Sequence, residues 1–63
     1  MYYVKYKDKY IKYKHQLGYD IISVVDDISN ASASRNRIRS SCIIDLAKEQ
    51  LSEQDDVFEI IEI

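Results

Sequence analysis

Apolar and polar residues alternate through the first fifteen positions of the chain, MYYVKYKDKYIKYKH. Tyr, Val and Ile favour β-strands, and the polar pair Asp8-Lys9 between them predicts a hairpin with a two-residue turn. In that hairpin Lys7 would face Tyr10, and Lys5 would face Lys12. Because side chains alternate across a strand, the two faces would then differ in character. The core face would carry Tyr2, Val4, Tyr6, Ile11 and Tyr13, and the solvent face Tyr3, Lys5, Lys7, Tyr10, Lys12 and Lys14.

The same segment, residues 2–17, also permits a helix. Its apolar positions recur at spacings of three and four residues, which is typical of a helical stripe. Gly18 follows at the position of a helix C-cap glycine. The members of this stripe are Tyr3, Tyr6, Tyr10, Tyr13 and Leu17. The aromatic and β-branched content favours the hairpin, and the helix stays the alternative.

Two further segments with little alternation predict strands. Residues 20–25, DIISVV, place apolar side chains on both faces, which is typical of a strand covered on both sides. Residues 57–63, VFEIIEI, do the same at the end of the chain. This predicts a central position in the sheet for the last strand, or an edge covered by a second subunit, because an exposed apolar edge invites aggregation.

Residues 34–52, SRNRIRSSCIIDLAKEQLS, predict a helix, and residues 26–33 before it predict a turn or a single helical turn. Ser34 or Ser32 would be the N-cap. Apolar residues lie four apart on two neighbouring stripes of this helix: Ile38, Cys42 and Leu46 on one, and Ile43, Ala47 and Leu51 on the other. The order of elements is therefore β-β-β-α-β. It predicts one α+β domain over residues 1–63, in which a single helix covers one face of a small antiparallel or mixed sheet.

Length and composition exclude several classes of site. A chain of 63 residues buries a small core and gains stability from oligomers or partners, so a homodimer is an open prediction. With one cysteine and one histidine, Cys42 and His15, no disulfide or four-ligand zinc site can form, and we expect Cys42 to be a buried small hydrophobe. No apolar run approaches the roughly 20 residues of a membrane span, and the start lacks the apolar region of a signal peptide. We expect a cytoplasmic protein, in the host cytoplasm if viral, with no metal, cofactor or membrane contact.

Charge is distributed unevenly although the net charge is only −2. Five of the six lysines lie in residues 1–17 with one acid, Asp8, and seven acids lie in residues 40–63 with one lysine, Lys48. Such a field can orient docking, or the two ends can attract each other within the fold.

The solvent face of the hairpin is the first candidate contact surface. Tyrosine rings anchor protein interfaces, and aromatic platforms beside lysines also bind single-stranded nucleic acid. The overall acidity disfavours nucleic acid, since such domains are usually basic. The third alternative is an ordinary solvated strand face whose lysines oppose edge pairing. The candidate residues are Tyr3, Lys5, Lys7, Tyr10, Lys12 and Lys14.

Arg35, Arg37 and Arg39 form a second basic patch at the predicted helix start, and Arg35 and Arg39, four residues apart, share one side of the helix and are its candidate contact residues. Arginines at a helix N-terminus can hold a phosphate or a carboxylate. Alternatively they pair with Asp26, Asp27 or the acidic C-terminal region, which is the commoner use of surface arginines.

Taken in order, the segments YYVKYKDKYIKY, DIISVVDDISNA, the helix and VFEIIEI resemble small accessory proteins of bacteriophages of Gram-positive bacteria. The resemblance implies a host-takeover or anti-defence protein that binds and blocks a host protein. The tyrosine-lysine run alone is also similar to N-terminal segments of large DNA-virus proteins, which implies the helical alternative for residues 2–17.

No catalytic or cofactor motif occurs in the chain, and a domain of this size rarely builds an enclosed pocket. The sequence therefore predicts a non-enzymatic protein-binding module that inhibits a host or antiviral-defence protein by covering part of its surface. A nucleic-acid-binding accessory protein is the first alternative, and a structural homo-oligomer is the second.

Overall fold

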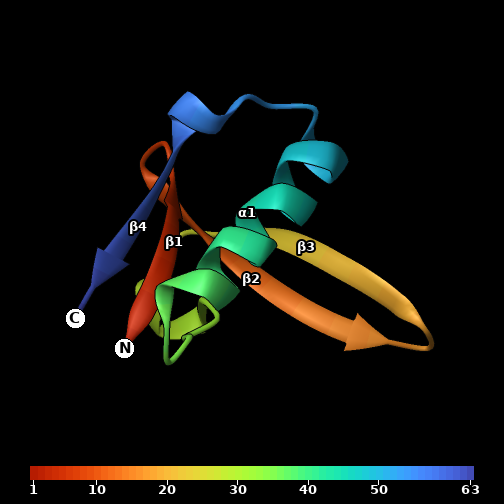
Figure 1. Cartoon of the computed structure of the whole chain (residues 1–63), viewed down its shortest axis with the longest axis horizontal. Coiled ribbons are helices and arrows are strands. Elements are labelled where there is room, and N and C mark those ends of the chain that lie inside the picture. The colour runs from red at the N-terminus through yellow and green to blue at the C-terminus, as the bar shows by residue number, and fades with distance from the viewer.

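A computed structural model describes all residues, 1–63, as one four-stranded sheet and one long helix (Figure 1). The strands are β1 (Tyr2–Tyr6), β2 (Lys9–Gln16), β3 (Tyr19–Val25) and β4 (Phe58–Glu62), and the helix is α1 (Arg37–Leu51). Two short 3₁₀ turns, η1 (Ile28–Asn30) and η2 (Asp55–Val57), precede α1 and β4. The strand order is β3-β2-β1-β4, with every pair antiparallel. The predicted α+β class and the order β-β-β-α-β are confirmed.

The first segment is a hairpin rather than a helix, but its turn is Lys7-Asp8 and not Asp8-Lys9. Lys5 pairs with Tyr10 and Tyr6 with Lys9, so the predicted pairs Lys7–Tyr10 and Lys5–Lys12 are wrong. The register is displaced by two residues, and a displacement of two leaves each side chain on its original face. In this register Lys7 and Lys9 both reach carboxylates, on Glu53 and Asp26.

The core lies between the sheet and α1 and is small. Val4 and Ile11 from the hairpin and Ile43 from α1 are its buried centre. Partly buried side chains surround this centre: Tyr6, Tyr13, Ile22, Ile44, Leu51 and Phe58. The predicted core face of the hairpin is therefore the face that α1 covers.

Strands β1 and β2 separate soon after their shared turn, and residues 32–34 occupy the space between them. Ser34 exchanges two backbone hydrogen bonds with Tyr2, both 2.8 Å long. Ser32 bonds β2 instead. Its N–H donates to the Ile11 carbonyl at 3.2 Å, and its Oγ accepts from the Tyr13 N–H at 2.7 Å and donates to the Tyr13 carbonyl at 3.1 Å. This segment replaces the missing strand pairing, so buried backbone groups keep their partners.

Strand β3 is less covered than predicted because the molecule has only one helical layer, and β4 takes the edge position, one of its two predicted alternatives. Strand β3 is an edge strand whose apolar side chains are partly exposed on both faces. Ile21, opposite Lys14 on the face away from α1, is 41% exposed, and Val24, opposite Ile11 on the α1 side, is 37% exposed. The prediction that residues 20–25 are covered on both sides is therefore wrong. Strand β4 is the other edge, beside β1, and not a central strand. Phe58 packs against the core from this edge.

Helix α1 begins later than the sequence predicts. Its N-cap is Asn36, whose Oδ1 accepts from the Arg39 N–H at 2.8 Å, whereas Ser32 and Ser34 belong to the segment that bonds the strands. Ser40, Ile43 and Ala47 face the sheet and are buried. Cys42 is exposed, so its predicted burial is wrong: the sheet covers only one of the two apolar stripes. No helix in the structure combines the length and apolar character needed to span a bilayer.

Candidate binding surface

The face of the sheet opposite α1, named the outer face below, brings together most of the predicted contact residues. Val4 and Ile11 point toward α1, and alternation sends their neighbours to the opposite side. Tyr3 and Lys5 on β1, and Tyr10, Lys12 and Lys14 on β2, therefore share the outer face. The two tyrosines and Lys5 are half-buried, whereas Lys12 and Lys14 are exposed.

Strand register fixes the neighbours of each residue on the outer face. Val25, Tyr10, Lys5 and Glu59 stand directly opposite one another in a row across all four strands. The other cross-strand pairs on this face are Tyr3 with Ile61, Lys12 with Ser23 and Lys14 with Ile21. The outer face thus combines aromatic, aliphatic and basic side chains, with Glu59 at the β4 edge as an acid.

The lysines divide into two groups by their partners. Lys7, Lys9 and Lys48 each have a carboxylate oxygen within 4.0 Å of the Nζ atom. Lys5, Lys12 and Lys14, which share the outer face, have none. The unpaired lysines are therefore gathered on the one face that lacks a helical layer.

Lys7 does not belong to this surface. It lies in the hairpin turn with φ 57°, and its Nζ is 3.0 Å from Glu53 Oε2 and 5.2 Å from the centroid of the Tyr6 ring. The predicted outer-face position of Lys7 is corrected for that reason: its ammonium group is held on the α1 side of the sheet.

Two clusters of ionisable groups lie on the α1 side of the sheet, one between the first hairpin and the end of α1, and one within the β2–β3 hairpin. The Tyr6 hydroxyl donates to Glu53. This bond, followed by the bond from Lys7, lowers the pKa of Glu53. The same Tyr6–Glu53 bond, followed by burial, raises the pKa of Tyr6. On the second hairpin, Tyr13 donates to Asp20 at 2.7 Å and His15 Nδ1 lies 2.9 Å from the same oxygen. These bonds lower the pKa of Asp20, with Tyr13 as the larger cause.

Arg35 and Arg39 are brought together, but not beside the outer face. Arg35 precedes α1 and Arg39 lies in its first turn, and both line a hollow of about 400 Å³ at the helix start. Arg39 also lines a groove with Tyr13, whose ring packs toward α1. The predicted contact residues therefore fall on two separate surfaces. Neither arginine pairs with Asp26 or Asp27: Asp26 binds Lys9, and Asp27 accepts from the Ser29 N–H.

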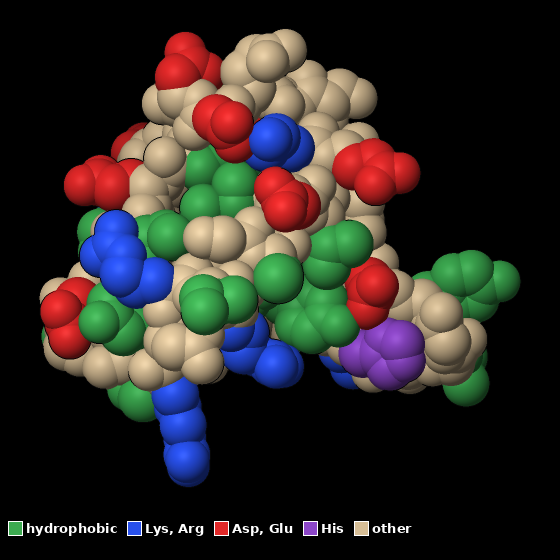
Figure 2. Space-filling model, viewed as in Figure 1, with side chains coloured by type: hydrophobic (Ala, Val, Ile, Leu, Met, Phe, Trp, Pro, Cys, Tyr) green, Lys and Arg blue, Asp and Glu red, His purple; other side chains and the backbone are tan.

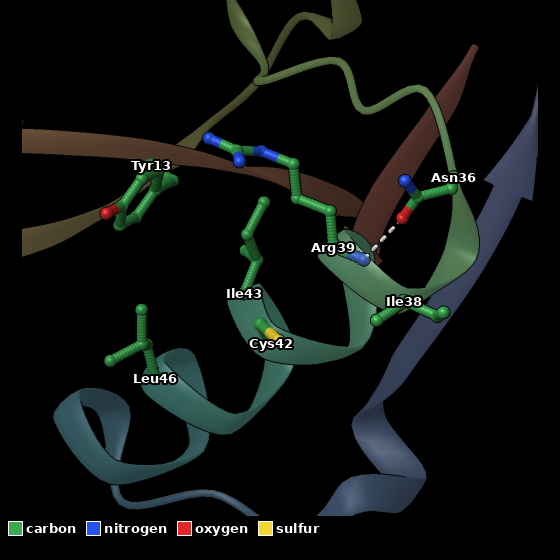
Figure 3. Close-up of a pocket in the computed structure, with 7 residues that line it drawn as sticks. All are labelled: Tyr13, Asn36, Ile38, Arg39, Cys42, Ile43 and Leu46. Atoms are coloured by element: carbon green, nitrogen blue, oxygen red, sulfur yellow. Dashed lines mark hydrogen bonds between the residues drawn. The ribbon is translucent and has the colours of Figure 1, made fainter.

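The groove between α1 and β2 has a volume of about 350 Å³ and a mostly apolar lining (Figure 3). Tyr13 faces Ile43 and Leu46 across it, and Arg39 lies over one end. The thiol of Cys42 belongs to the same lining and has no acid or base bonded to it. No group of three or more His, Cys, Asp or Glu side chains in the chain could hold a metal ion.

Sequence reasoning missed the part of the outer face that β3 contributes. Tyr19 and Ile21 stand opposite Gln16 and Lys14 and are 72% and 41% exposed. Leu17, in the turn between β2 and β3, is 87% exposed. Alternation along residues 19–25 divides their side chains between two faces. It shows which of them join the outer face only when β3 is known to pair with β2 at the edge of the sheet.

Comparison with known proteins adds no further constraint, since no family model, no curated protein and no solved structure matches the chain.

Proposed function

We propose that this chain is a small non-enzymatic binding module that docks the outer face of its sheet on an acidic surface of a partner protein. The observation that supports this most is the sorting of the lysines. Lys5, Lys12 and Lys14 form no ion pair and share one face, whereas every other lysine forms one. Glu59 stands opposite Lys5 across the strands without pairing with it. Clustered, unpaired charge of one sign steers a partner of the opposite sign and sets its orientation.

The aromatic and aliphatic side chains of the outer face supply the apolar part of such an interface. Tyr3 and Tyr10 are half-buried, so their rings are partly ordered before binding and lose less conformational freedom on it. Ile61 and Val25 flank them across the strands. An apolar centre surrounded by charge is the usual anatomy of a protein interface.

In this proposal the module acts by occupying its partner's surface, and the partner is a host or antiviral-defence protein. The likeness of its segment order to bacteriophage accessory proteins motivates that role. A single small domain with a basic contact face suits inhibition by occlusion, because nothing beyond binding is required of it.

A pull-down from nuclease-treated lysate of a Gram-positive bacterium tests the proposal. The bait is the wild-type chain beside two variants: Tyr3→Ala/Tyr10→Ala/Lys12→Glu on the outer face, and Asp45→Lys/Glu49→Lys on the exposed side of α1 as a matched control. We expect one stoichiometric protein that survives nuclease, re-forms the complex from purified components, and is lost only with the outer-face variant. Equal capture by both variants would show that the outer face is ordinary solvated surface.

A second function, binding of single-stranded nucleic acid, is supported by one specific observation. Tyr3 and Tyr10 stand on neighbouring strands of an antiparallel sheet, next to unpaired lysines, and stacking platforms beside basic side chains bind such strands. Salt dependence separates the two functions. Binding of a labelled oligothymidylate should weaken linearly with the logarithm of salt concentration, whereas a protein interface anchored by tyrosines should depend on salt only weakly.

A further inference from the structure

The start of α1 carries a hollow of about 400 Å³ on the molecular surface, apart from the outer face. The residue before β1, the segment before the helix and the first helical turn all contribute to it. Its lining residues are Met1, Ala33, Ser34, Arg35, Asn36 and Arg39.

The electrostatics of this hollow are positive and uncompensated. The first turn of α1 contains no acidic residue, although the positive end of a helix dipole favours one there. Two arginines line the hollow instead, and neither forms an ion pair. Asn36, which also lines the hollow, uses its side-chain oxygen to cap the Arg39 N–H.

Ser34 supplies an independent observation in the same place. It is 2% exposed, and its Oγ forms no hydrogen bond, while its backbone groups are bonded to Tyr2. A buried hydroxyl without a partner is unfavourable, and such orphaned groups are few in native proteins. Ser34 lines the hollow. Because a serine hydroxyl can rotate, it could donate to a group bound there.

We propose that this hollow binds a phosphate group. Arg35 and Arg39 would hold its oxygens through charge-assisted hydrogen bonds, the Ser34 hydroxyl would donate to one oxygen, and the positive end of the α1 dipole would favour the bound charge. A tetrahedral dianion with three or four acceptor oxygens matches this set of donors from several directions. The bound charge offsets both the arginines and the helix dipole, which no side chain of the chain itself does.

Inorganic phosphate and phosphate monoesters share the charged oxygens that this site would bind. The site does not depend on the function proposed for the outer face. Loss of the partner in a pull-down and loss of phosphate binding are therefore separate results.

Titration of the ¹⁵N-labelled chain with inorganic phosphate, followed by amide chemical shifts, tests the site. Sodium chloride at matched ionic strength is the reference, and phosphoserine and adenosine monophosphate are the ester arms. We expect saturable shifts, at millimolar phosphate, centred on the amides of the lining residues Arg35, Asn36 and Arg39. Tighter binding of both esters than of phosphate identifies a monoester site, and tighter binding of phosphate identifies a site for the free ion.

Matched variants make the result decisive. Arg35→Gln and Arg39→Gln should each weaken binding about tenfold or more, and Ser34→Ala should weaken it without unfolding the chain. Arg37→Gln is the control, because Arg37 stays outside the hollow, with its guanidinium 5.9 Å from the centroid of the Tyr2 ring. Shifts that do not saturate, that chloride reproduces, or that the Arg35 and Arg39 variants leave unchanged would overturn the proposal.

Discussion

At the scale of single residues, two serines in one short segment have opposite roles. Ser32 Oγ forms two hydrogen bonds with the backbone of Tyr13, whereas Ser34 Oγ forms none. Removing a hydroxyl that satisfies backbone groups leaves them unpaired, while removing an unpaired hydroxyl relieves an unfavourable group. Ser32→Ala should lower the free energy of unfolding by about 1–3 kcal/mol. Ser34→Ala, the matched control, should leave it unchanged or raise it, and urea denaturation of the two variants measures both. Equal destabilisation by the two changes would mean that Ser32 does not close the gap between β1 and β2.

Glu53 gives the chain a predictable response to acid. Its pKa lies below the ordinary value of 4.5 because Tyr6 and Lys7 donate to its carboxylate. A carboxyl with a lower pKa in the folded state stabilises the fold above its unfolded pKa, and this contribution is lost as pH falls through the folded pKa. Glu53→Gln should therefore lower the free energy of unfolding at neutral pH and make it fall less steeply as the pH drops below 4.5. Part of the fall should remain, because the pKa of Asp20 is also lowered. Chemical denaturation at a series of pH values checks this. Glu49→Gln serves as the control, since Glu49 forms no ion pair, and an unchanged pH profile in Glu53→Gln would refute the role of this carboxylate.

At the scale of elements, the turn between β2 and β3 is strained by its sequence. Leu17 and Gly18 both have positive φ, 54° and 79°, which is typical of a type I′ turn with Asn-Gly as its preferred pair. Leu17→Asn should stabilise the chain by about 0.5–1 kcal/mol, because asparagine tolerates the left-handed region better than leucine. Leu17 is 87% exposed, so little packing is lost. Thermal unfolding measures the gain against Leu17→Ala, which removes the same side chain without the turn preference. If both variants unfold at the same temperature, turn geometry does not limit this hairpin.

The sequence predicted the kinds of elements well because each depends on local pattern. Alternation identified the hairpin and sorted its faces, and with them Tyr3, Lys5, Tyr10, Lys12 and Lys14 as one surface. The turn position was missed because two registers that differ by two residues sort the faces identically. The exposure of Cys42 and of β3 was missed because it depends on how many layers cover the sheet, and the sequence left open whether the last strand is central or at an edge. Residues 32–34 insert between two strands through hydrogen bonds to residues far away in the sequence, so no local pattern predicts this insertion.

At the scale of the whole molecule, stability should be distributed unevenly. The far end of the β2–β3 hairpin projects past α1 (Figure 1), and all residues from 14 to 21 are exposed. Gln50 on α1 ties this hairpin to the helix through the Asp20 carbonyl and the Ile22 N–H. Amide hydrogen exchange should show low protection over residues 14–21, by local opening, and protection close to the global value at Val4 and Ile11. Gln50→Ala should lower protection in the hairpin alone. Uniform protection along the chain would contradict this.

The charges of the whole molecule also separate by face. Asp and Glu side chains gather around the C-terminal half of α1 on the helix side (Figure 2), whereas the unpaired lysines lie on the opposite side of the sheet. An acidic partner should therefore approach from the outer face and be repelled from the C-terminal half of α1.

The affinity of the purified partner for two matched variants tests the outer face most directly. Calorimetric titration would compare Tyr10→Ala/Lys12→Glu on the outer face with Asp45→Lys/Glu49→Lys on α1, after amide spectra confirm that both are folded. We expect the outer-face variant to lose about a hundredfold or more in affinity, as truncation of an aromatic anchor does, and the α1 variant to bind like the wild type. Normal binding by the outer-face variant, with binding lost in the α1 variant, would show that the partner contacts the helix side and not the sheet.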